Sequence, residues 1–336
     1  MKKRIIFFLI GLKIFYYLIM FIVLPLSIMK GGDKIYENFF KNAKVIYYTD
    51  EDSANLKELS NEHESENKYK KMVSIFKTIE NGLLNEKYYT IDLSIKNERV
   101  LRTVIFEDSS MGIIEYKGNS SKIVFKTKDN IYFATYGENY NEIIINLNMS
   151  LVKYNVKTQD KEVLDEFIDI ECKPDINKTG DIIYISYNYK LREKDRDSSK
   201  EVITVLKKNK EKLYFENCIG KYPVWNPKES GFYYAGKDRD ENLYYYNLKT
   251  KESKSISSGV KILANMSVSD DGRFIAYLKN KIVDEWAWEY SYRPQLEIYN
   301  TDKKIKKVIK TFDDYIYETS EYEKSRDDFK IFIFSN

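Results

Sequence analysis

The chain has 336 residues, of which 43% are hydrophobic and 15% aromatic, with only five prolines and 13 glycines. This composition excludes collagen-like, proline-rich and disordered chains, and the length allows a sizeable buried core. Lysine and arginine number 55 against 52 acids, so the sequence lacks the strongly basic balance of a nucleic-acid-binding protein. The single histidine, His63, excludes a histidine-rich metal site and leaves one candidate for a histidine-based catalytic triad.

A long apolar segment, Ile5–Met29, stands near the N-terminus and follows the basic residues of Met1–Arg4. Its 25 residues suffice to span a bilayer, and the basic flank predicts that the N-terminus stays in the cytoplasm. We therefore expect a single-pass protein of the cell membrane, with a cytoplasmic stub at 1–4, a transmembrane signal anchor at 5–29, a linker at 30–42 and an extracytoplasmic domain at 43–336. The alternative is a cleaved signal peptide whose apolar core is Ile14–Met29, which would also export the remainder.

From about Ala43 onward, short runs of β-branched and aromatic residues alternate with polar turn residues. This pattern is typical of an all-β sandwich, barrel or propeller. The segment Asp52–Leu84 differs, because it is charged and places Met72, Ile75, Ile79 and Leu83 at helical spacing. It predicts a helical insertion between strands.

Similar segments recur at a spacing of about 45 residues, which decides among these architectures. A turn followed by a strand recurs as NKTGDIIYIS at 177–186, NPKESGFYYA at 226–235 and SDDGRFIAYL at 269–278. A second strand ends in Tyr-Asn and leads into a basic turn, within 151–164, 243–256 and 296–309. A four-stranded propeller blade has this size and content, so we expect a β-propeller of about six blades, with five or seven as alternatives.

The two ends of the propeller also carry strand patterns. Runs at Ala43–Tyr48 and Tyr89–Leu93 indicate a degenerate first blade that carries the helical insertion. The last apolar run, Lys330–Ser335, is expected to pair with N-terminal strands, because an open apolar edge strand invites aggregation.

The segments Tyr222–Ser257 and Val268–Leu278 resemble the WD40-like repeats of TolB-type β-propellers. The W-S-P of that repeat corresponds to Trp225, Asn226 and Pro227 in this chain, and its D-G corresponds to Asp271 and Gly272. The chain departs from the repeat where Tyr-Asn replaces Tyr-Asp and where Lys251 replaces the glycine of T-G. The resemblance implies the fold and suggests a scaffold of the cell envelope, but it carries over no partner.

The chain has two cysteines, Cys172 and Cys218, which are 46 residues apart. That separation is about one blade, so the two residues are expected side by side. In an exported domain two cysteines can form one disulfide bridge, and the equal alternative is two buried thiols.

The segment Val283–Pro294 concentrates aromatic residues between two predicted blade strands. Trp286, Trp288, Tyr290 and Tyr292 alternate, so an extended chain would place all four on one face. Aromatic residues are enriched at interfaces and stack on ligands, and with the adjacent Arg293 they form the candidate binding site. The alternative is that the aromatic residues pack onto their own blade or a neighbouring one.

No nucleophile-elbow, nucleotide-binding or H-E-x-x-H pattern occurs, so we expect no enzyme, no cofactor and no metal. Acidic residues in two equivalent loops could meet at one rim, but solvated turns account for them better than a calcium site; they are Asp195, Asp197, Asp238, Asp240 and Glu241. The predicted function is a non-catalytic, protein-binding scaffold of the cell envelope. The alternative is a propeller that binds glycans or processes them with a pair of carboxylates.

Overall fold

The computed structural model describes the following residues: 43–49, 57–59, 89–96, 99–118, 120–170, 172–187, 201–228, 230–236, 242–258, 266–286, 289–312, 317–318 and 329–335. Every regular element within these ranges is a β-strand. Across them, no helix is both long and apolar enough to span a bilayer. The predicted anchor at 5–29 lies outside the described residues, and so does His63.

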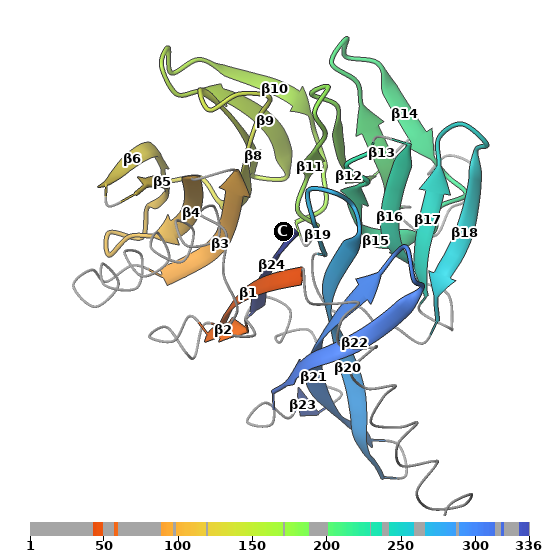
Figure 1. The fold of residues 1–336 in the computed structure, drawn as a ribbon. Coiled ribbons are helices and arrows are strands. Elements are labelled where there is room, and N and C mark those ends of the chain that lie inside the picture. The colour runs from red at the N-terminus through yellow and green to blue at the C-terminus, as the bar shows by residue number, and fades with distance from the viewer. Residues whose placement is uncertain are drawn as a thin grey trace, which may run out of the picture. The chain divides into compact units, whose positions relative to one another are not determined.

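Five antiparallel sheets follow one another along the chain, each built from strands in sequence order, and we call them blades 1 to 5 (Figure 1). Blade 1 holds β3 (Tyr89–Lys96), β4 (Arg99–Ile105), β5 (Met111–Lys117) and β6 (Ser120–Thr127). Blade 2 holds β7 (Ile131–Tyr136), β8 (Glu142–Leu147), β9 (Ser150–Asn155) and β10 (Lys161–Asp165). Blade 3 holds β11 (Asp175–Ile176), β12 (Ile182–Tyr187), β13 (Glu201–Leu206) and β14 (Lys212–Phe215).

The last two blades follow the same plan. Blade 4 holds β15 (Gly220–Trp225), β16 (Gly231–Gly236), β17 (Leu243–Asn247) and β18 (Glu252–Ser257). Blade 5 holds β19 (Ser267–Val268), β20 (Phe274–Trp286), β21 (Glu289–Asn300) and β22 (Ile305–Thr311), and the short β23 (Tyr317–Glu318) pairs with β21. The predicted all-β propeller fold is therefore confirmed.

The expectation of about six blades is wrong, because the described chain forms five. The strand β1 (Ala43–Thr49) lies between β2 (Lys57–Leu59) and β24 (Phe329–Ser335) in a separate three-stranded sheet, whereas Tyr89 begins the complete blade 1. The two N-terminal runs assigned to one degenerate blade thus belong to different sheets. Lys57–Leu59 is also extended where a helical insertion was predicted, since it pairs with Val45–Tyr47. The rest of 52–84 lies outside the described residues.

The C-terminal strand β24 pairs with β1, as expected for the run Lys330–Ser335. It also lies beside β19 and β20 of blade 5. The apolar edge that this run would otherwise expose is therefore paired.

The middle strand β8 is apolar on both faces because blade 2 packs between blades 1 and 3. On β8, Ile143 and Ile145 join a buried cluster with residues of blade 1, while Ile144 joins a cluster with residues of blade 3. Since successive side chains of a strand point to opposite faces, the continuous run of three isoleucines fills both interfaces. This packing explains why such runs do not alternate with polar residues.

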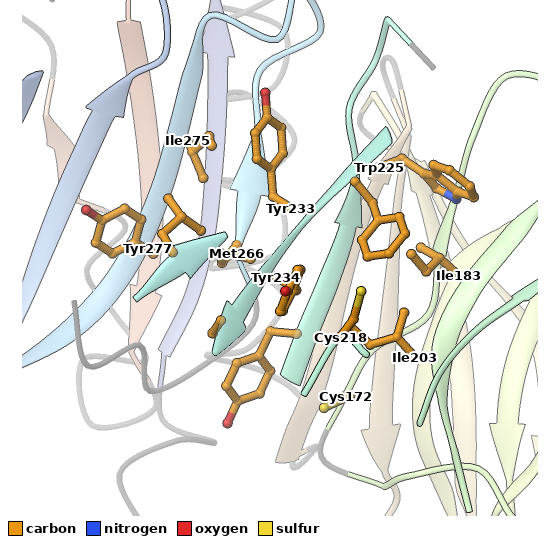
Figure 2. Packing of buried hydrophobic residues seen from close by; sticks show 14 of the residues in the cluster. Cys172, Ile183, Ile203, Cys218, Trp225, Tyr233, Tyr234, Met266, Ile275 and Tyr277 are labelled. Carbon is orange, nitrogen blue, oxygen red and sulfur yellow. The ribbon is translucent and has the colours of Figure 1, made fainter. Parts of the chain in front are cut away.

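The largest buried cluster joins blades 3, 4 and 5 (Figure 2). Trp225 of blade 4 lies in it with 4% of its surface exposed, which confirms its place in the core. Phe232, also of blade 4, is fully buried, and the Phe215 ring of blade 3 meets its ring edge-on with centroids 5.1 Å apart. The aromatic content of the sequence is thus used largely between blades.

The repeated Tyr-Asn pairs end strands at turns with one shared geometry. In the β17–β18 turn, the Asn247 side-chain oxygen accepts hydrogen bonds from the backbone N–H groups of Lys249 and Thr250. The backbone N–H of Lys251 donates to the Asn247 carbonyl at 2.9 Å, and Lys251 has a φ of 58°. Asn155 and Asn300 make the same bonds in their turns, with Gln159 and Lys304 at positive φ. The repeat therefore encodes a capped turn rather than a functional group.

Candidate functional site

The predicted aromatic segment belongs to a long hairpin of blade 5. The strands β20 and β21 continue beyond the blade's other strands, and Trp286 is paired with Glu289. Trp286 and Tyr290 therefore stand on different strands, and the expectation of one extended stripe is wrong. Trp288 lies outside the described residues.

The hairpin brings part of the predicted set together. Tyr290 and Tyr292 are two residues apart on β21, where Tyr292 is in register with Ile282 on one side and Tyr317 of β23 on the other. Arg293 is in register with Lys281 and is partly buried. Whether these residues bind anything stays a prediction.

Cys172 and Cys218 are separate thiols, both buried in the cluster that joins blades 3, 4 and 5 (Figure 2). The predicted disulfide is absent, and the alternative of two buried thiols describes the structure. Burial raises the pKa of both thiols above its ordinary value. Because the thiolate is the reactive form, both cysteines are poor nucleophiles.

The acidic loops considered as a calcium site fall outside the described residues, which end at Tyr187 and Gly236 on the near side of each loop. Within the described ranges, no three histidine, cysteine or carboxylate side chains gather in a way that could hold a metal ion.

An exposed apolar surface lies where blade 2 meets blade 3, and it was not predicted from the sequence. It consists of Met149, Phe167 and Ile170, which are 36%, 46% and 39% exposed. Met149 lies in the β8–β9 turn, and the other two lie in the segment that leads from β10 to β11. The backbone N–H of Ile168 donates to the Met149 carbonyl at 2.8 Å and so joins the two segments. We call these three residues the apolar surface.

The backbone beneath the apolar surface is fixed by hydrogen bonds from both blades. The Phe167 carbonyl accepts from the backbone N–H of Tyr187 at 2.9 Å, and the N–H of Asp169 donates to the Ile185 carbonyl at 2.9 Å. The buried Asp169 carboxylate accepts from the Tyr187 hydroxyl at 3.0 Å and from the Cys172 backbone N–H at 3.0 Å. Phe167 is therefore held in place and does not project from a free loop.

This arrangement requires an unfavourable backbone conformation at two of the exposed residues. Met149 and Phe167 have φ values of 64° and 59°, a region that costs a residue with a side chain about 1–2 kcal/mol. At Met149 this conformation belongs to the two-residue β8–β9 turn, in which Asn148 also has a positive φ of 50°. At Phe167 it lies in the segment that connects blades 2 and 3. Here the strain accompanies apolar side chains that point to solvent, where burial gives no compensation.

Acidic groups border the apolar surface. Glu166 is exposed next to Phe167, and Asp129 accepts a hydrogen bond from the Asn148 side chain at 3.1 Å beside Met149. The signal in the sequence was the short acidic and apolar stretch DEFIDIE at 165–171. By its residue types this stretch predicts another blade strand. Only the tertiary contacts bury Ile168 and leave Phe167 and Ile170 exposed.

Four other exposed apolar residues have a simpler explanation. Ile123, Val163, Tyr214 and Val308 stand one to a blade on the outermost strands β6, β10, β14 and β22. Each of these strands also carries lysines, as edge strands do when they avoid pairing with other chains. Scattered single residues of this kind are normal on a protein surface.

No protein-family model matches the chain, and no curated protein is detectably similar to it. Solved structures of similar fold include TolB from Acinetobacter baumannii, at 14% identity and a TM-score of 0.46, over 75% of this chain and 62% of that one. The putative TolB from Agrobacterium tumefaciens matches at 10% identity and a TM-score of 0.41, over 65% of this chain and 94% of that one. The tricorn protease matches at 14% identity and a TM-score of 0.37, over 66% of this chain and 22% of that one. The chain thus spans less than two thirds of the first of these proteins.

Proposed function

We propose that this protein is a non-catalytic β-propeller, anchored in the cell membrane by residues 5–29, that binds a protein partner on the extracytoplasmic side. The observation that carries the proposal is the apolar surface of Met149, Phe167 and Ile170. Exposed apolar side chains that a hydrogen-bonded backbone holds toward solvent are unfavourable in the isolated protein. Burying these side chains against a partner would remove the unfavourable free energy of their exposure to water.

The chemistry of the surface favours a protein as the partner. Phenylalanine, methionine and isoleucine offer apolar contact without the hydrogen-bonding groups that orient a sugar. The acidic border adds a preference for a partner segment with basic residues around an apolar centre.

Site-specific photo-cross-linking in intact cells tests the proposal. A photoreactive phenylalanine analogue placed at Phe167 or Ile170 of the full chain is expected to give an adduct of one defined mass. The same analogue at Val163 or Tyr214, which are 58% and 46% exposed on outermost strands, is the matched control. Adducts that are absent at Phe167 and Ile170, or equal at all four positions, would contradict the proposed binding surface.

A double variant separates binding from folding. Phe167→Ser with Ile170→Ser is expected to remove the adduct formed from a photoreactive residue at Met149. The variant should leave the free energy of unfolding within about 0.5 kcal/mol of the parent chain, because both side chains are exposed. A large loss of stability would mean that the two residues act in the fold.

Cell fractionation tests the anchor and its orientation. The full chain is expected in the membrane fraction after alkaline extraction, and a chain that lacks 5–29 should be absent from it. Protease added outside spheroplasts should digest the propeller. Protection from that protease would place the propeller on the cytoplasmic side and contradict the proposed location.

A further inference from the structure

A basic surface runs along the outer part of blades 4 and 5. The β17–β18 turn, the β21–β22 turn and the strands that follow them hold eight lysines and two carboxylates, Glu252 and Asp302. The lysines are Lys249, Lys251, Lys254, Lys303, Lys304, Lys306, Lys307 and Lys310. The whole chain has a net charge of only +3, so positive charge is concentrated here. We call these eight lysines the basic edge.

Hydrogen bonds join the lysine-bearing part of blade 5 to β18 of blade 4. The Lys306 ammonium donates to the Ser258 carbonyl at 3.0 Å, just beyond the end of β18. The Tyr299 hydroxyl donates to the Ile256 carbonyl of β18 at 2.9 Å. The lysine-bearing part of blade 5 therefore adjoins the end of β18 at Ile256 and Ser258, whereas Lys249 and Lys251 lie at the other end of that strand.

The corresponding turn of blade 3 is also basic, but its charge is neutralised. Lys207, Lys208 and Lys210 form ion pairs with Asp181, Glu138 and Glu162 at 2.7–2.9 Å. Within the described ranges, no carboxylate pairs with Lys249, Lys251, Lys254 or Lys304, and all four are exposed. These four lysines of the basic edge thus present charge that no described carboxylate compensates, unlike the equivalent turn of blade 3.

Protection of an edge strand explains only some of these lysines. Lysine on an outermost strand prevents pairing with another chain, and this role suits Lys254, Lys306, Lys307 and Lys310. Lys249, Lys251, Lys303 and Lys304 lie in turns, which expose no strand edge. The asparagine-capped turns hold these residues at fixed positions, and two of them, Lys251 and Lys304, have positive φ.

We propose that the basic edge rests on the anionic phospholipid headgroups of the membrane that holds the N-terminal segment. The inference depends on the anchoring in the proposed function. The linker of 13 residues at 30–42 reaches at most about 45 Å, which keeps the propeller close to the headgroups. Lysine is a hydrated point charge that suits a diffuse array of phosphates, and each one near an anionic leaflet strengthens attachment about fivefold.

Lysine footprinting of the full chain in lipid nanodiscs tests the inference. The probe is an amine-acetylating reagent, with nanodiscs of phosphatidylcholine alone or mixed with phosphatidylglycerol. Acetylation of Lys249, Lys251 and Lys304 is expected to fall about fivefold or more in the anionic nanodiscs and to recover at high salt. Lys117, Lys157 and Lys178, which are exposed elsewhere, should be labelled equally in both. Equal labelling of the basic edge in the two lipids would overturn the inference.

A charge variant provides the matched comparison. Lys249, Lys251, Lys254 and Lys304 are changed together to glutamine, because Gln159 holds the equivalent positive-φ position in blade 2. The remaining Lys303 and Lys306 should then lose their protection. The same change at the exposed Lys117, Lys128, Lys157 and Lys178 should leave that protection intact. Protection that survives the first variant, or that disappears in both, would overturn the inference.

Two further controls distinguish failure of the basic-edge proposal from failure of the proposed membrane anchor. Polyphosphate added to the neutral nanodiscs should not reproduce the protection, and an equal effect would reassign the basic edge to a soluble polyanion. A chain that does not enter neutral nanodiscs would disprove the anchor alone. If that chain still associates with anionic nanodiscs, the inference that the basic edge binds anionic headgroups is supported. If it associates with neither kind of nanodisc, that inference is overturned.

Discussion

The carboxylate of Asp175 accepts a hydrogen bond from the backbone N–H of Trp225 at 2.7 Å, and this bond joins the first strand of blade 3 to the first strand of blade 4. A second bond comes from the backbone N–H of Ile176 at 2.9 Å. Desolvation nevertheless outweighs both bonds and raises the pKa of Asp175 to about 6. An ionised carboxylate at this junction therefore costs stability near neutral pH.

Asp175 should make the folded state more stable as the pH falls. A raised carboxyl pKa means that the folded chain binds the proton more tightly than the unfolded chain, so stability rises between about pH 6 and pH 4, by up to about 3 kcal/mol. Asp175→Asn keeps an acceptor for Trp225 and removes the charge, so it should match or exceed the parent chain at pH 7.5 and lose that advantage near pH 4. Urea denaturation of both chains at a series of pH values measures the difference. Parallel curves would show that Asp175 does not titrate in this window.

The ion pair of Lys173 and Asp92 should be important for stability. It joins the segment before β11 to β3 of blade 1 at 2.8 Å, and the side chains are 17% and 4% exposed. Lys173→Met would leave the Asp92 carboxylate buried without its cation and is expected to cost about 3 kcal/mol. Adding Asp92→Asn should recover part of that loss, because the pair is coupled. Thermal unfolding of the three variants measures this, and additive losses would contradict the coupling.

Lys251 should be replaceable by glycine with a gain in stability. Its φ of 58° strains a residue that has a side chain, and the related repeat has glycine there. Lys251→Gly is expected to stabilise the chain by about 0.5–1 kcal/mol. Lys249→Gly, in the same turn but without a positive φ, should lower stability by a similar amount. If both variants lower the denaturation midpoint, positive φ is not a source of strain in this turn.

The two cysteines should be unreactive in the native chain. Both are buried and have raised pKa values, so iodoacetamide at pH 8 is expected to add nothing within the time that labels a free thiol. After denaturation, mass spectrometry should show two added groups whether or not reductant is present. Two groups only after reduction would indicate a disulfide.

The sequence by itself determined the propeller class, the capped turns and the pairing of the C-terminal run. The first two features follow from local order: runs such as Ile143–Ile145 need burial on both faces, and the Asn247 side chain caps its turn by accepting bonds from Lys249 and Thr250. The third follows from the need to cover an apolar edge. The period near 45 residues records one blade, but it did not give the number of blades. A strand's partner depends on distant segments, and β1 pairs with β24 nearly 300 residues later.

Only the tertiary structure decided where the candidate surfaces lie. The alternation from Trp286 to Tyr292 predicted one aromatic face, but the pairing of Trp286 with Glu289 assigns its ends to opposite strands of a hairpin. The stretch DEFIDIE at 165–171 did not reveal that Phe167 is exposed, because that exposure depends on hydrogen bonds in which Tyr187 and Met149 of neighbouring blades take part. Periodicity reports which side of a strand is buried. Exposure in a connecting segment depends instead on packing between blades, which no local pattern records.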